Sequence, residues 1–257
     1  MKGFCTLASG SKGNSLYFGT DKTKILFDVG LSVKTLKEKL ENKQVELENI
    51  DAIFITHEHS DHIKGLEQIV KLYDIPVIAN HETAKAICSL IDIKPRFKIF
   101  CTGENFSFQD LTFKPFSIQH DTVDPVGFII EANKMKLGLC TDLGCVTTTV
   151  LNALRNLDFL ILEANHKVDL VHASSRPDVY KQRVLSRLGH LSNDESAKLI
   201  SSVYHPGLKK VFLAHLSEEC NTPTIAMETI RSHLDQAGIE LPLEIAFQDK
   251  HSSWVSY

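Results

Sequence analysis

The sequence has no run of about 18 or more apolar residues, the length that a helix needs to cross a bilayer, so we expect no membrane span. The first ten residues have too short an apolar core for a secretory signal. The six cysteines are scattered and include no Cys-x-x-Cys pair, so they are interpreted as small buried apolar residues. Together these absences predict a cytoplasmic protein.

Linkers are missing as well, because no low-complexity stretch or block of like charge divides the 257 residues. We therefore expect a single domain over residues 1–257, and a composition that is 43% hydrophobic can bury a substantial core. The formal net charge of −4 does not indicate a nucleic-acid binder. It does not exclude one, because an enzyme can bind phosphates locally through metals and a few basic side chains.

The most informative stretch is Thr56-His57-Glu58-His59-Ser60-Asp61-His62, which directly follows an apolar run at 52–55. The run predicts a buried strand, and apolar residues at helical spacing after the motif predict a helix. Imidazole nitrogens and carboxylate oxygens are ligands that zinc, manganese and iron accept. A solvated histidine-rich loop is the alternative. The position at a strand end favours a site, and four ligands in one segment indicate two metals.

Four other predicted strands also run into residues that bind metals or protons. They are 113–119 before His120, 136–140 before Asp142, 158–162 before Glu163 and His166, and 210–214 before His215. Such residues at separate strand ends are expected to converge in one deep site.

The order of the predicted elements is α/β, with strands and helices followed by a second set of strands and helices, and it suits two sheets flanked by helices. Asp28 follows an early strand and is expected to accept a hydrogen bond near the site. The turn at 9–14, which includes Ser11 and Asn14, contains two glycines and Lys12. Its backbone amides are expected either to bind an anion or to form a plain tight hairpin.

The spacing His57-x-His59-x-Asp61-His62 resembles the signature of the metallo-β-lactamase-fold hydrolases. Further stretches resemble the YycJ/WalJ group of small metal-dependent nucleases, which are related to RNase Z-type enzymes: residues 9–15, 163–166, 189–193 and 214–217. The resemblance implies an αββα fold with two mixed β-sheets. It also implies a dinuclear metal-dependent hydrolase acting on nucleic acid, DNA rather than RNA, from the 5′ end.

The same resemblance implies a ligand set for two divalent ions, zinc, manganese or iron. One ion would take His57, His59 and His120, the second would take Asp61, His62 and His215, and Asp142 would bridge them. Ions about 3.5–4 Å apart can hold a hydroxide that acts as the nucleophile. The expected catalytic residues are Asp61 and His190, and His190 would steady the phosphate or protonate the leaving oxygen. For His190 the alternative is a residue at a helix entry with Ser192 as the cap.

Metal ligands alone do not choose between phosphodiesters, thioesters and β-lactams. Basic residues ahead of His190 favour a phosphodiester, and Arg183 and Arg187 are expected to share one face of a helix over 178–188. An ordinary solvated helix face is the alternative. Glu163, His166, Ser11 and Asn14 are expected to orient ligands or touch substrate, against a purely structural role. A glyoxalase II-type thioester hydrolase and an RNA-processing nuclease remain open, as does the oligomeric state.

Overall fold

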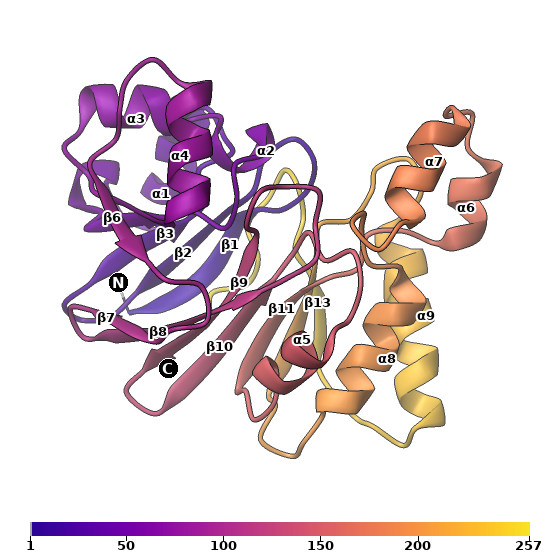
Figure 1. The fold of residues 1–257 in the computed structure, drawn as a ribbon. Helices are drawn as coiled ribbons and strands as arrows, with labels where there is room; N and C mark the ends of the chain where they lie inside the picture. Colours follow the sequence, from indigo (N-terminus) through magenta and orange to yellow (C-terminus); the bar gives the residue numbers. More distant parts are fainter. Residues whose placement is uncertain (1) are drawn as a thin grey trace. The chain divides into compact units, whose positions relative to one another are not determined.

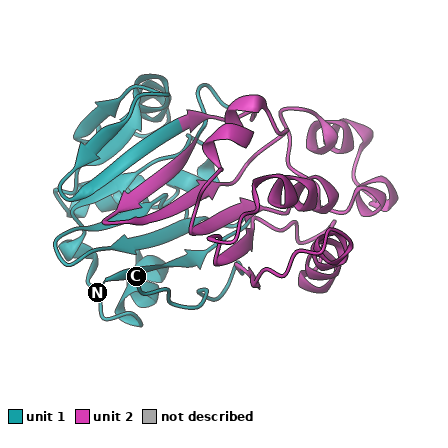
Figure 2. Cartoon of the chain, turned by 90° about the horizontal axis from the view of Figure 1, so that it is seen from below, with its two compact units in different colours: residues 1–115, 122–126, 247–257 teal, residues 116–121, 127–246 magenta. Residues whose placement is uncertain are grey.

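The computed structural model describes residues 2–257, which form two mixed β-sheets with helices packed on them (Figure 1). The predicted α/β class with two mixed sheets flanked by helices is confirmed. Two compact units share the chain (Figure 2): residues 1–115, 122–126 and 247–257 form the first, and residues 116–121 and 127–246 form the second. The expectation of a single domain stays a prediction. Among the described residues, no helix combines the length and apolar character needed to span a membrane.

The first unit contains the six-stranded sheet, in which the strands follow one another in sequence order. Antiparallel pairing joins the first three strands, and the last three continue parallel to the third. The strands are β1 (Gly3–Ala8), β2 (Ser15–Gly19), β3 (Lys24–Phe27), β4 (Ala52–Phe54), β5 (Val77–Asn80) and β6 (Phe97–Phe100). The helices are α1 (Val33–Glu41), the short 3-10 helix η1 (Leu47–Asn49), α2 (Ser60–Ile63), α3 (Leu66–Leu72) and α4 (His81–Leu90).

The core of the first unit holds the strand that leads into the histidine motif. Successive side chains of a strand point to opposite faces of the sheet. Leu26 and Ile53 therefore pack with the apolar side chains of the helices, whereas Phe27 and Phe54 contact Phe113 on the other face. Full burial of one such side chain contributes about 1.5–3 kcal/mol, so β4 is firmly fixed where the motif begins.

The second unit contains the parallel part of the seven-stranded sheet, whose order is β13-β12-β11-β10-β9-β8-β7. Strands β10 to β13 are parallel, and β9 is antiparallel to β10. The strands are β7 (Phe106–Phe108), β8 (Leu111–Ser117), β9 (Val126–Ala132), β10 (Met135–Cys140), β11 (Phe159–Glu163), β12 (Lys210–Ala214) and β13 (Leu243–Ile245). The helices are α5 (Thr148–Ala153), α6 (Val168–Ala173), α7 (Asp178–Leu185), α8 (Asn193–Val203) and α9 (Pro223–Gln236). Because β10, β11 and β12 are parallel, the residues after them meet at one edge of the sheet.

The helix expected after the motif is interrupted at Gly65, which separates α2 from α3. The backbone N–H of Gly65 donates to the carbonyl of Val29 at 2.8 Å. A Cβ atom at this position would lie 2.4 Å from the carbonyl oxygen of Leu31, so only glycine allows this approach. Periodicity alone gives no sign of this break, because the apolar spacing continues across it.

The expectation that Arg183 and Arg187 share a helix face is wrong. Helix α7 ends at Leu185, and Ser186 has extended backbone, so Arg187 lies beyond the helix. The reason is local, because the Ser186 hydroxyl donates to the carbonyl of Arg183 at 2.9 Å. A serine side chain that bonds to nearby backbone in this way competes with helix continuation.

Candidate metal centre

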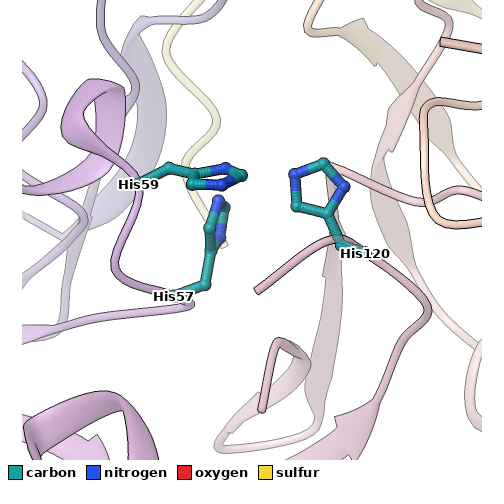
Figure 3. Close-up of side chains that lie close together, drawn as sticks. All are labelled: His57, His59 and His120. Carbon is teal, nitrogen blue, oxygen red and sulfur yellow. The ribbon is translucent and has the colours of Figure 1, made fainter. Parts of the chain in front are cut away.

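The motif residues of the first unit follow β4 and then enter a helical turn. His59 is the N-cap of α2, so Asp61 and His62 lie in the first turn of that helix. Figure 3 shows the rings of His57 and His59 beside each other, with centroids 4.9 Å apart. The His57 and His62 rings lie 3.9 Å apart. The alternation of His57 and His59 therefore directs their rings to the same side of the segment.

One carboxylate, Asp28, determines which ring nitrogen carries the hydrogen in His57 and His62. His62 Nδ1 lies 2.8 Å from Asp28 Oδ2, and the Thr56 hydroxyl donates to the same oxygen at 2.9 Å. The Thr56 oxygen lies 3.0 Å from His57 Nδ1 and is left to accept from it. Both rings thus carry hydrogen on Nδ1 and the lone pair on Nε2, which is the form that binds metal. The hydrogen-bond acceptor expected at Asp28 is present.

Asp28 is held in place by unusual backbone. Its φ is 57°, in the left-handed region that non-glycine residues rarely adopt. The backbone N–H of Thr56 donates to its other oxygen, Oδ1, at 2.9 Å, and its own N–H donates to the carbonyl of Phe54. Asp28 is only 4% exposed. Such strain at a buried carboxylate is typical of functional sites.

The second unit brings three further predicted ligands to strand ends. Asp142 follows β10 and His215 follows β12, and both have left-handed backbone, with φ of 57° and 55°. His215 Nδ1 lies 3.4 Å and His120 Nε2 lies 3.8 Å from Asp142 Oδ1. His120 Nδ1 lies 3.0 Å from the carbonyl oxygen of Gly189, which accepts its hydrogen. All three side chains are buried, with 1–4% of each residue exposed.

Glu163, at the end of β11, joins these strand ends through four hydrogen bonds. Its Oε1 lies 2.8 Å from His190 Nδ1 and 2.9 Å from His215 Nδ1. Its Oε2 accepts the backbone N–H groups of Leu143 and Leu191 at 2.7 and 3.0 Å. Burial alone would raise the pKa of Glu163, but the charge and hydrogen bond of His190 and the hydrogen bond of His215 outweigh it and lower the pKa to about 2. Glu163 is therefore an ionised acceptor that sets the tautomer of both rings.

Within the second unit, Asp142, Glu163, His190 and His215 each offer one ligand atom, and these atoms lie within 4.8 Å of one another. The side chain of His190 is 20% exposed, more than those of the other three. With Nδ1 bonded to Glu163, its exposed chemistry is on Nε2. This geometry suits an imidazole that exchanges a proton with a bound molecule through Nε2. Ser192 is the N-cap of α8, as the helix-entry alternative for His190 expected.

The remaining candidates of the second unit have partners within their own unit. His166 is 2% exposed, its Nδ1 lies 3.3 Å from Asn165 Oδ1, and burial chiefly lowers its pKa to about 4. Its neutral, buried state favours the structural alternative. Arg183 donates to Asp121 at 2.5 Å, which offsets its charge, while Arg187 is exposed. Because Arg183 is paired with Asp121 and Arg187 lies beyond α7, these two residues do not form the expected basic face of one helix.

Two amides of the turn at 9–14 donate to side chains of the first unit. The N–H of Gly10 donates to Asn14 Oδ1, and the N–H of Lys12 donates to Gln248 Oε1. These bonds favour the tight-hairpin alternative over an anion cradle. Ser11 is exposed at the tip, whereas Asn14 is buried and contacts Asp61.

Several contributors to the site have no signal in the sequence. The carbonyl of Gly189 and the amides of Leu143 and Leu191 are backbone groups, so their residue types carry no information. Asn165 was not predicted as a site residue, although it lies between the candidates Glu163 and His166. Its Nδ2 donates to the carbonyl of His215 at 2.8 Å. A polar residue in an apolar strand-end context was the available signal.

Comparisons with known proteins identify the family and the fold of the chain. A family model described as the beta-lactamase superfamily domain matches residues 23–216. The chain is 35% identical to "Exodeoxyribonuclease YycJ" of Bacillus anthracis, covering 91% of this chain and 90% of that protein. It is 35% identical to "Exodeoxyribonuclease WalJ" of Streptococcus pneumoniae serotype 2, covering 96% and 93%. Among solved structures, Zn²⁺-bound PqqB of Methylobacterium extorquens is similar in fold, with a TM-score of 0.72 at 15% identity over 97% of this chain and 99% of PqqB.

Proposed function

The chain belongs to the β-lactamase superfamily and has the metallo-β-lactamase fold, and from this premise we propose that it is a metal-dependent exodeoxyribonuclease. The nuclease activity is supported by relatives of that name at 35% identity over more than 90% of this chain. The observation that carries the metal centre is the proton arrangement of the ligand histidines. Four of them have Nδ1 next to an acceptor within their own unit: His57, His62, His120 and His215.

The donor set fits divalent ions. An acceptor at Nδ1 leaves the lone pair of each imidazole on Nε2, and such partners are nearly always found behind metal-binding histidines. We propose that His57, His59 and His120, the side chains drawn in Figure 3, hold one ion. Asp61, His62 and His215 would hold the second ion, and Asp142 would bridge the two. Neutral imidazoles mixed with carboxylates suit zinc or manganese, with iron as a third choice.

When bound, two such ions would activate a water molecule and neutralise charge on the phosphate oxygens. Residues of the chain would protonate the leaving group and orient the water. Glu163 holds His190 at Nδ1, so a protonated His190 would carry its transferable hydrogen on Nε2 and donate it to the leaving oxygen of deoxyribose. Asp61, the other proposed catalytic residue, would orient the attacking water with its carboxylate.

The substrate is proposed to be DNA rather than RNA, digested from the 5′ end in the cytoplasm. Local groups must attract it, because the net charge of −4 gives no general attraction to phosphates. The ions and His190 would supply that attraction at the cleaved bond.

End-labelled substrates test this proposal. Single- and double-stranded DNA, matched RNA and an acyl-glutathione thioester are incubated with the protein and manganese or zinc. We expect mononucleotides from the 5′ end of DNA and no turnover by Asp142→Ala. Thioester turnover with intact DNA would identify a thioester hydrolase instead, and faster digestion of RNA would identify an RNA-processing nuclease.

A further inference from the structure

The side chain of Asn14 contacts two of the proposed metal ligands, and both contacts lie within the first unit. Its Nδ2 donates to Asp61 Oδ2 at 3.1 Å and lies 3.0 Å from His62 Nε2. Its Oδ1 accepts the backbone N–H of Gly10 at 2.8 Å, which fixes the nitrogen end of the amide toward the ligands. Asn14 is 6% exposed, so little water competes for these contacts.

The backbone of Asn14 is joined to the same helical turn. Its N–H donates to the carbonyl of Asp61 at 2.8 Å, and its carbonyl accepts the N–H of Gly30 at 3.0 Å. A Cβ atom on Gly30 would lie 1.6 Å from the Asp61 carbonyl oxygen, so the two segments are in direct backbone contact. Movement of the turn at 9–14 would therefore move Asp61.

The C-terminal segment braces this turn from its other side. Gln248 Oε1 accepts the N–H of Lys12, and Gln248 Nε2 donates to the carbonyl of Gly13, each at 2.9 Å. Gly10 has a φ of 145° and Gly13 a φ of 146°, a conformation that favours glycine. A turn fixed by its glycines and by Gln248 holds the Asn14 amide in one orientation.

We propose that Asn14 is a positioning residue that sets the affinity of the chain for the ion held by Asp61 and His62, an inference that rests on the proposed two-metal function. A carboxylate with one oxygen bonded to Asn14 cannot rotate freely, so it is already oriented as a ligand. His62 is oriented from the other side, because its Nδ1 is bonded to Asp28. Loss of a group behind a metal ligand typically weakens metal binding by about 10–100-fold.

A residue that only stabilises the turn would behave differently. Its removal would lower the stability of the metal-free protein and leave the metal affinity unchanged. Metal affinity and metal-free stability therefore separate the two roles without any measurement of nuclease activity.

The test is a titration of the metal-free full chain with zinc and with manganese against a chromophoric chelator, together with thermal unfolding of the metal-free protein. The variants are Asn14→Ala and Asn14→Ser; serine keeps an oxygen near the Gly10 amide but is too short to reach Asp61. The control is Thr23→Ala, a buried and hydrogen-bonded turn residue at the other end of β2. Gln248→Ala removes the two hydrogen bonds that join Gln248 to the turn at 9–14.

We expect the wild-type chain to bind two ions and both Asn14 variants to bind one of them about 10–100-fold more weakly. Gln248→Ala should show a smaller loss, and Thr23→Ala should keep both affinities despite a lower Tm. Unchanged affinities in Asn14→Ser would overturn the inference, even if Asn14→Ala does not fold. A wild-type chain that binds no divalent ion would instead overturn the proposed function.

Discussion

Asp28→Asn tests whether the hydrogen bonds of Asp28 fix the metal-binding tautomers of His57 and His62. Asparagine has the same shape as aspartate and tolerates left-handed backbone, so the φ of 57° at this position is not disturbed. The change replaces a carboxylate that accepts three hydrogen bonds, from His62, the Thr56 hydroxyl and the Thr56 amide. An amide has one acceptor oxygen and one NH₂ group, so at least one of these donors loses its partner.

The magnitude follows from those contacts. Each hydrogen bond to a charged acceptor contributes about 1.5–3 kcal/mol, so the loss of one or two lowers the free energy of unfolding by several kcal/mol. If the NH₂ group faces His62 Nδ1, the ring must carry its hydrogen on Nε2 and cannot bind metal through that atom. Loss of such a partner costs about 10–100-fold in metal affinity, and two histidines depend on Asp28.

The assay pairs metal analysis with DNA digestion over a range of manganese concentrations. We expect weaker metal binding and partial recovery of activity as manganese is raised. The control is Asp51→Asn, which removes the charge of a carboxylate that accepts a backbone N–H at the other end of β4. Wild-type metal affinity in Asp28→Asn would show that Asp28 does not control metal binding through the tautomers of His57 and His62.

Four other predictions concern single residues. Asp142→Ala should lower metal content and abolish activity, which elemental analysis and the DNA assay measure together. His190→Ala should keep its metal but slow turnover by about 10²–10⁴-fold, and loss of metal would show that His190 is a ligand. Glu163→Gln should reduce both kcat and metal affinity, because His190 and the proposed ligand His215 both lose an ionised partner. Because the pKa of buried His166 falls to about 4 when folded, the unfolded chain binds the extra proton first, so stability drops by about 2 kcal/mol from pH 7 to 5; urea titrations of wild type and His166→Gln should differ in this slope.

The sequence was most informative where apolar patterns end in polar residues. The strand before the motif and the bounds of β12 follow their predictions because local side-chain chemistry decides them. The role of Asp28 as an acceptor was also predictable, since a carboxylate directly after a buried strand needs a partner.

Other features depend on contacts between segments far apart in the chain. The break at Gly65 arises from its approach to the carbonyls of Val29 and Leu31, and no local pattern encodes it. The early end of α7 is a local exception, because the Ser186 hydroxyl donates to the carbonyl of Arg183, and residue spacing does not reveal that bond. The sharing of Glu163 between His190 and His215 depends on the ends of β11 and β12 meeting the segment between α7 and α8. Sequence spacing cannot supply such distances.

We propose that ligands from distant parts of the chain hold two divalent ions that support the cleavage of DNA. The most direct measurement adds zero, one and two equivalents of manganese to the metal-free protein and follows digestion of 5′-labelled DNA. We predict no digestion without metal and full activity only when the second equivalent is bound. Full activity of the metal-free protein in excess chelator, or a chain that binds no divalent ion, would contradict it.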